Sequence, residues 1–189
     1  MKRTRDGMPR VDFLGTGNAF SPPGRMHALA LIDDSILIDT PPTLLAQLRR
    51  SGFSGSAIKH ILFTHWHGDH IFGFPFLMLD RKYISDREGK ASLDVYLRPG
   101  GIDILESLCR SGFPGSLESL DHIIDWHESE HDEIGDTGWK FYRFPVLHNP
   151  DTDPHGYELV HESGFRLLHC GDSGPVSYTH LTLPTILLV

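Results

Sequence analysis

Cysteine is scarce in this sequence of 189 residues, which contains only Cys109 and Cys170. Two isolated cysteines are too few for a disulfide framework, so we expect both to be small buried side chains in a protein of a reducing compartment, the cytoplasm. Long apolar runs are also absent: none could span a bilayer, and none follows the basic residues at the N-terminus as in a signal peptide. We therefore expect no membrane as a partner.

Basic residues are outnumbered, with 17 Lys and Arg against 25 Asp and Glu and a formal net charge of -8. Proteins that coat nucleic acids or bind anionic membranes normally carry an excess of Lys and Arg, so the net charge argues against both classes. The net charge does not exclude a local basic patch. Histidine, by contrast, is abundant at 13 residues. Because histidine is the commonest metal ligand, the positions of these residues carry the functional information.

The apolar pattern predicts one mixed α/β domain. A helix is expected with Thr40 as its N-cap, Pro41 in its first turn and Gly52 as its stop. Many short strands with few intervening helices indicate a sandwich of sheets covered by helices. The expected strands are residues 11–14, 28–32, 36–38, 61–63, 93–97, 123–126, 139–145, 157–161 and 165–169. The other expected helices lie within residues 71–83, with a start around Gly73 to Pro75, and at residues 102–110.

The densest group of metal-ligand residue types follows the strand expected at residues 61–63. In an extended segment, residues two apart point to the same side, so His65 and His67 can share one metal ion. Gly68 permits a sharp turn, which would direct Asp69 and His70 towards a second metal ion. A solvated loop would explain any one of these residues, but four ligand types within six positions favour a two-metal site.

This His-x-His-x-Asp-His pattern resembles the signature of the metallo-β-lactamase superfamily. The segment from Phe13 to Gly17 and the hairpin ending at Asp39 are also similar to that superfamily, and the resemblance extends over about residues 11–175. It implies an α/β fold, a four-layer αβ/βα sandwich. It also implies two Zn²⁺ ions, with Mn²⁺ or Fe as alternatives.

Two further ligands follow from the resemblance. His148 resembles the histidine that completes the imidazole set of the first metal, although His155 and His161 lie nearby and a plain loop histidine stays an alternative. Asp172 resembles the carboxylate that bridges both metals. The expected metal ligands are therefore His65, His67, Asp69, His70, His148 and Asp172.

The superfamily's last metal-binding histidine has no convincing counterpart after Asp172, because His180 follows too soon. Residues 176–189 resemble the translation of a sequencing adapter. We therefore expect an incomplete metallo-β-lactamase-like domain at residues 1–175 and a non-native tail at residues 176–189. The missing histidine and the general acid would then lie outside this sequence, and we expect the chain as given to be inactive.

Within the superfamily, the stretch from His67 to Gly73 is similar to the ribonuclease Z branch, zinc phosphodiesterases that trim transfer-RNA precursors at their 3′ end. The stretch from Ile38 to Pro42 instead looks like the related cyclic-phosphate phosphodiesterases. The resemblance implies a hydrolase for a tRNA precursor or a small cyclic phosphate, with Asp69 as catalytic proton acceptor and a homodimer left open. The alternatives are a carboxyl-ester, lactone or thioester hydrolase and a catalytically silent metal-binding module.

Two other polar segments have simpler interpretations. The run from Trp126 to Glu133 contains ligand types, but a solvated acidic edge is favoured over another metal site, because nothing makes these side chains converge. Arg25 and His27 lie in a loop rich in Pro and Gly, where an exposed loop is favoured over contact with a substrate phosphate.

Overall fold

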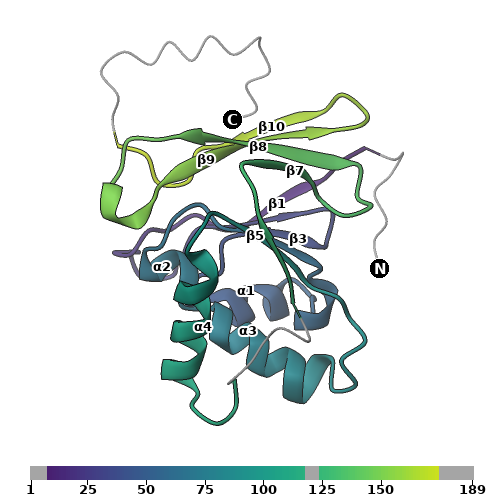
Figure 1. Ribbon diagram of the computed structural model, residues 1–189, viewed down its shortest axis with the longest axis vertical. Helices are drawn as coiled ribbons and strands as arrows, with labels where there is room; N and C mark the ends of the chain where they lie inside the picture. The colour runs from purple at the N-terminus through teal and green to yellow at the C-terminus, as the bar shows by residue number, and fades with distance from the viewer. Residues whose placement is uncertain (1–7, 118–123, 175–189) are drawn as a thin grey trace.

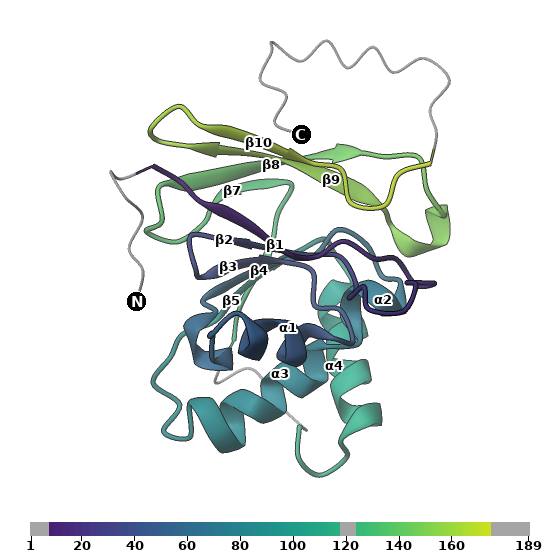
Figure 2. The ribbon, with the colours of Figure 1, turned by 180° about the vertical axis from the view of Figure 1, so that it is seen from behind.

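Two β-sheets pack face to face, and helices cover the outer face of one of them (Figures 1 and 2). The computed structural model describes residues 8–117 and 124–174. The larger sheet has the strand order β1-β2-β3-β4-β5-β6, and the smaller one has the order β10-β9-β8-β7. The strands are β1 Val11–Gly15, β2 Leu29–Ile32, β3 Ile36–Ile38, β4 His60–Leu62, β5 Asp94–Leu97, β6 Asp125–Glu128, β7 His131–Glu133, β8 Trp139–Pro145, β9 His155–His161 and β10 Arg166–His169.

Within the described residues, four α-helices and three further helical turns connect the strands. The α-helices are α1 Leu44–Arg50, α2 Gly68–Ile71, α3 Phe74–Asp80 and α4 Gly101–Gly112, and the short turns are η2 Gly55–Ala57, η3 Arg81–Ser85 and η4 Pro150–Thr152. None of the helices within the described ranges is long and apolar enough to cross a bilayer.

The larger sheet begins antiparallel and continues parallel, because β3, β4, β5 and β6 all run in the same direction. Its central strands are buried on both faces, and alternate side chains serve different cores. Leu37 and Ile61 belong to the core under the helices, whereas Ile38 and Leu62 belong to the core between the sheets. The parallel strands therefore share one carboxyl edge, where loops leave a rigid support.

The α/β sandwich agrees with the sequence-based expectation, but the described residues form three layers, whereas the complete fold was expected to have four. Helices α1, α3 and α4 form one layer on the larger sheet, and the smaller sheet covers its other face (Figures 1 and 2). No helix within residues 8–117 and 124–174 covers the outer face of the smaller sheet. The described residues thus supply three of the four expected layers, and the expected tail at residues 176–189 lies outside them.

The expected start of the first helix is wrong. Helix α1 begins at Leu44 with Thr43 in the N-cap position, while Thr40 is fully buried and its backbone N–H donates to the carbonyl of His70 at 2.7 Å. The two prolines that follow Thr40 explain the shift, because the residue before a proline avoids the helical conformation. The expected stop is confirmed: Gly52 has a φ of +83°.

The remaining differences lie in polar segments. The helix expected to start around Gly73 to Pro75 is confirmed as α3, which continues into the π-helical turn η3, whereas the short helix α2 before it was not expected. Strand β7 was not expected, because its residues lack apolar alternation; it lies at an edge of the smaller sheet. Within the described ranges, the acidic run shows no metal-binding cluster. Cys109 is buried as expected, whereas Cys170 is only half-buried.

Arg25 and His27, in the loop after β1, were both expected to be exposed, and one of the two is. Arg25 is exposed, as an ordinary surface loop predicts. His27 is half-buried, and its Nδ1 lies 3.1 Å from the hydroxyl of Thr43. This histidine therefore attaches the loop to the beginning of α1.

Candidate metal centre

The His-rich segment leaves the larger sheet at the carboxyl edge of its parallel strands. Strand β4 ends at Leu62, and α2 begins at Gly68 with the extended His67 in its N-cap position. The smaller sheet holds the connecting residues in place: the hydroxyl of Tyr157 donates to the carbonyl of Phe63 at 2.6 Å, and the backbone N–H of His155 donates to the carbonyl of Thr64 at 3.1 Å. Both sheets thus fix the segment.

Three histidines converge beside this segment. Nδ1 of His67 lies 3.0 Å from Nε2 of His65 and 3.0 Å from Nε2 of His148. One nitrogen from each of the three rings lies within 4.8 Å of the others. His148 follows strand β8 and is 81 residues away from His67 in the sequence, so the packing of the two sheets assembles this group.

The two neighbouring histidines that stood as alternatives to His148 lie elsewhere. His155 is buried, and Arg143 donates to its Nε2 at 2.7 Å. The Nδ1 atom of His161 lies 2.9 Å from the hydroxyl of Ser163. Neither belongs to a metal-binding group within the described part of the chain.

A second group adjoins the first. His65, His70 and Asp172 bring one ligand atom each within 4.8 Å of one another. Nε2 of His70 lies 3.5 Å from Asp172 and 3.6 Å from the carboxylate of Asp69. The sequence assigned His65 to the first metal alone, whereas the structure places it at the border of both groups. Asp172 follows strand β10, so the second group also needs both sheets.

Sequence reasoning missed Asp39 as a residue of this site. Asp39 directly follows strand β3, is 2% exposed and has a φ of +67°. Its carboxylate accepts hydrogen bonds from the backbone N–H and the hydroxyl of Thr64, both at 2.8 Å, and lies 2.7 Å from Nδ1 of His70. A carboxylate directly after a wholly apolar strand was an available signal, because such a group is buried and needs donors.

The electrostatics of the second group favour a cation. Burial by itself would lower the pKa of His70, but the carboxylates of Asp39 and Asp172 outweigh burial and raise this pKa to about 10. The hydrogen bond from His70 lowers the pKa of Asp172 to about 2, against the effect of its partial burial. Two ionised carboxylates therefore surround His70 at neutral pH and create a negative potential.

His65 has the opposite shift. Burial, assisted by the charge of His70, lowers its pKa to about 4. Its imidazole is therefore neutral at physiological pH and keeps a lone pair for a metal ion. Imidazole nitrogens together with carboxylate oxygens are a donor set that suits zinc, manganese and iron, so the residues present fit divalent ions of this kind.

Comparison with known families decides where this chain belongs. The family model for Anti-Pycsar protein Apyc1 matches residues 9–176, which is most of the chain. The chain belongs to the Apyc1 family. The match spans nearly the same residues as the resemblance at 11–175 and includes every candidate ligand.

Curated relatives of this Apyc1-family chain carry the name Ribonuclease Z. The chain is 32% identical over 124 residues to the protein from Methanothermobacter thermautotrophicus, covering 64% of the chain and 38% of that protein. It is 34% identical over 103 residues to the protein from Picrophilus torridus, covering 52% and 32%. The chain thus spans about a third to two-fifths of the length of these relatives.

Solved structures confirm the fold of this Apyc1-family chain. YhfI from Bacillus subtilis, described as a metallo-β-lactamase fold protein, matches with a TM-score of 0.69 and 16% identity, covering 87% of this chain and 63% of that one. The short form of human tRNase Z matches with a TM-score of 0.66 and 23% identity, covering 90% and 71%. The fold expected from the His-x-His-x-Asp-His pattern is therefore confirmed.

Proposed function

We propose that this chain carries the metal centre of a phosphodiesterase that uses two divalent ions, with Zn²⁺ as the expected metal and Mn²⁺ or Fe as alternatives. The convergence of His65, His67 and His148 beside His70 and Asp172 carries this proposal. The carboxylates of Asp39 and Asp172, on either side of His70, are consistent with a cation at this position. The names of the curated relatives support hydrolysis of a phosphodiester in particular.

Each ligand has a role in this proposal. The imidazoles of His65, His67 and His148 would hold the first ion, and Asp69, His70 and Asp172 the second, with Asp172 shared between the two. Bound divalent ions would make a coordinated water more acidic and neutralise charge on the phosphate oxygens. The list of proposed ligands is thus the one derived from the sequence.

Asp69 is also proposed as the proton acceptor for the attacking water. Its side chain is 13% exposed, and its carboxylate lies 3.6 Å from Nε2 of His70. A partly exposed carboxylate beside the ligand cluster can receive a proton and release it to solvent. Asp39 does not take this role, because it is buried and already accepts three hydrogen bonds.

The 3′ end of an RNA, such as a tRNA precursor, is the first substrate proposed. The identity to proteins named Ribonuclease Z supports it. A cytoplasmic location and a homodimer stay predictions. Cell fractionation checks the location, and size-exclusion chromatography with light scattering checks the homodimer.

A small cyclic phosphodiester is the second candidate substrate. The formal charge of -8 favours it, because an acidic protein repels a long polyanion more strongly than a single phosphate. The matching family model is that of Apyc1 rather than one named for ribonuclease Z, and it spans residues 9–176. Both observations support a small cyclic phosphate as the alternative to an RNA substrate.

Because the chain as given is expected to be inactive, the experiment uses the full-length parent protein and compares bis(p-nitrophenyl) phosphate with p-nitrophenyl acetate at saturating Zn²⁺ or Mn²⁺. We expect turnover of the phosphodiester, with loss of that turnover in His67→Ala and full retention in His131→Ala, an exposed histidine on edge strand β7. Hydrolysis of the acetate alone would support a carboxyl-ester hydrolase instead. Metal binding without turnover of either compound would support the catalytically silent module.

A second comparison separates the two phosphodiester substrates. A tRNA precursor with a 3′ trailer and a nucleoside 3′,5′-cyclic phosphate are offered at equal concentration. Cleavage of the precursor at the trailer supports the RNA substrate. Preferential ring opening of the cyclic phosphate supports the second candidate.

A further inference from the structure

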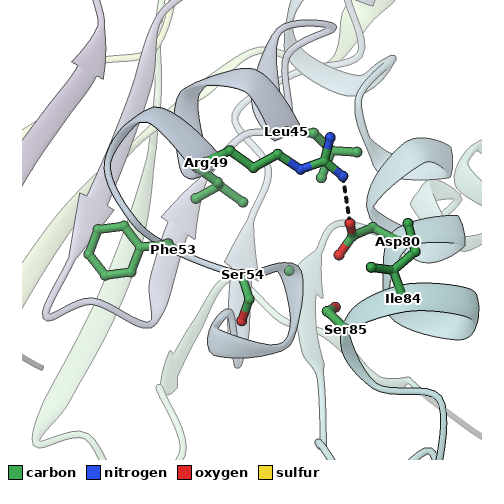
Figure 3. Close-up of a pocket in the computed structure, with 9 residues that line it drawn as sticks. Leu45, Arg49, Phe53, Ser54, Asp80, Ile84 and Ser85 are labelled. Carbon is green, nitrogen blue, oxygen red and sulfur yellow. Dashed lines mark hydrogen bonds and ion pairs between the residues drawn. The ribbon is translucent and has the colours of Figure 1, made fainter.

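A pocket of about 210 Å³ lies between α1 and the turn η3, where Arg49 and Asp80 form an ion pair at 2.9 Å (Figure 3). None of the described residues that line this pocket belongs to the metal cluster. A substrate whose phosphate meets the metal cluster therefore needs a binding surface beside the ligands themselves.

The beginning of α2 forms an accessible side of the metal cluster. His65 and His70 are buried, whereas His67, Gly68 and Asp69 are half-buried. Gly68 has no side chain, so its backbone is what solvent meets between the two candidate ligands that flank it. A substrate can therefore approach the cluster across residues 67–69.

Phe72 places an aromatic ring on this accessible side. It follows α2 directly and lies four residues after Gly68, so its side chain points back towards the beginning of the helix. A Cβ atom on Gly68 would lie 2.4 Å from Cε2, 2.6 Å from Cζ and 2.8 Å from Cδ2 of this ring. The ring thus lies against the backbone between His67 and Asp69, whose Cα atoms are each about 3.8 Å from that of Gly68.

The position of Phe72, rather than its exposure, distinguishes it from other phenylalanines. Single exposed apolar side chains are common and need no function. Phe72 is 51% exposed and Phe76 is 49% exposed, but the ring of Phe76 packs edge-to-face on Phe113 at 5.2 Å. The ring of Phe72 instead lies on a glycine between two candidate metal ligands. Its exposed part is therefore available to a molecule bound at the cluster.

A second exposed apolar side chain adjoins the cluster from the smaller sheet. Leu147 is 59% exposed and directly precedes His148. Its carbonyl accepts a hydrogen bond from the backbone N–H of Gly174 at 2.5 Å, which connects it to the segment that carries Asp172. Exposed apolar groups thus stand next to ligands from both sheets, and they suit an uncharged, flat part of a substrate better than a charged one.

We propose that Phe72 is a platform on which a nucleobase of the substrate stacks while the attached phosphate lies at the metal cluster. This inference rests on the proposed phosphodiesterase function and adds a substrate class, phosphodiesters of nucleotides. Stacking on an aromatic side chain accepts any base, because every base has a flat π face. The platform therefore serves the 3′ end of an RNA and a nucleoside cyclic phosphate alike.

The test uses the full-length parent protein loaded with Zn²⁺ and two compounds that differ in the base, uridine 5′-monophosphate and ribose 5-phosphate. Isothermal titration measures both dissociation constants. We expect the nucleotide to bind about tenfold more tightly, within the range measured for the stacking of one base on an aromatic side chain. In NMR spectra, the H5 and H6 protons of the bound uracil should shift upfield, because they lie over the ring of Phe72.

Three variants assign the effect to this ring. Phe72→Leu keeps an apolar side chain without a ring, so it should lose the tenfold advantage of the nucleotide and the upfield shift, while ribose 5-phosphate binds as before. Phe72→Tyr keeps a ring and should retain both effects. Phe76→Leu is the matched control, because it removes a half-exposed phenylalanine ring that packs on Phe113, and it should behave as the unaltered protein does.

Two results would overturn the platform alone. One is equal affinity of the unaltered protein for the nucleotide and for ribose 5-phosphate. The other is a nucleotide affinity and an upfield shift that both persist in Phe72→Leu. A different result would overturn the proposed function and the platform with it: ribose 5-phosphate that fails to bind the Zn²⁺-loaded protein, or that binds His67→Ala equally well.

Discussion

Nδ1 of His70 lies 2.7 Å from Oδ2 of Asp39, although 31 residues separate the two in the sequence. Both side chains are buried, and Asp39 is fixed in turn by Thr64. This contact sets the orientation of the imidazole, so its other nitrogen, Nε2, faces Asp69 and Asp172. A carboxylate behind a metal-binding histidine generally raises its affinity for the ion.

Asp39→Asn should therefore weaken zinc binding by about 10-fold to 100-fold, because the amide cannot hold the ring of His70 in the same way. Isothermal titration with Zn²⁺ measures the effect. Asp136→Asn is the control, since Asp136 is exposed. Equal zinc affinity in the two variants would show that Asp39 has no part in the site.

The variants His67→Ala and Asp69→Ala should differ in which metal ion they lose. His67 lies 3.0 Å from both neighbours in the first group, so its loss should remove the first ion and abolish turnover. Asp69→Ala should weaken the second ion and also remove the proposed proton acceptor. Metal analysis and phosphodiesterase assays distinguish the two defects. Activity that survives in both variants would show that the motif is not catalytic.

Gly73→Ala should destabilise the fold by about 3 kcal/mol, because the new Cβ would lie 2.1 Å from the carbonyl oxygen of Pro41. Gly112→Ala is the matched substitution, since the nearest atom to its new Cβ lies 4.0 Å away. Its stability should change by less than about 1 kcal/mol. Urea unfolding compares the variants, and equal midpoints would refute the close approach of Gly73 to Pro41.

The fold should lose stability in mild acid through His155. Burial, assisted by the charge of Arg143, lowers the pKa of His155 from 6.5 to about 4. The unfolded chain therefore binds a proton on this histidine below about pH 6.5 that the folded chain refuses, so stability falls as the pH falls towards 4.

His155→Gln should reduce this loss by about 2 kcal/mol at pH 5, as calculated from the two pKa values. Urea unfolding of both proteins at pH 7 and pH 5 measures the difference. His161→Gln serves as control, because the half-buried His161 at the end of β9 has a hydroxyl, that of Ser163, as its side-chain partner. Parallel pH dependences of His155→Gln and the unaltered chain would contradict this prediction.

The sequence predicted those parts of the site that depend on local geometry or on a family pattern. His65 to His70 form one segment, so their spacing alone indicated metal binding. His148 and Asp172 came from resemblance, because no local rule selects one histidine among His148, His155 and His161. The structure distinguishes these histidines through the packing of β8 and β9 against the His-rich segment.

Other features depend on contacts that a single segment does not reveal. Asp39 was missed because its partner, His70, lies 31 residues away in helix α2. The N-cap at Thr43 was missed because the prolines after Thr40 delay the start of the helix. The acidic strand β7 was missed because edge strands can form without an apolar face.

Zinc titration of the full-length parent protein tests the central claim most directly. We predict binding of about two Zn²⁺ ions per chain, with both His67→Ala and His148→Ala losing the same ion. His131→Ala should bind as the unaltered chain does. If neither His67→Ala nor His148→Ala alters the amount of zinc bound or its affinity, the two clusters of histidine and aspartate are not a metal centre.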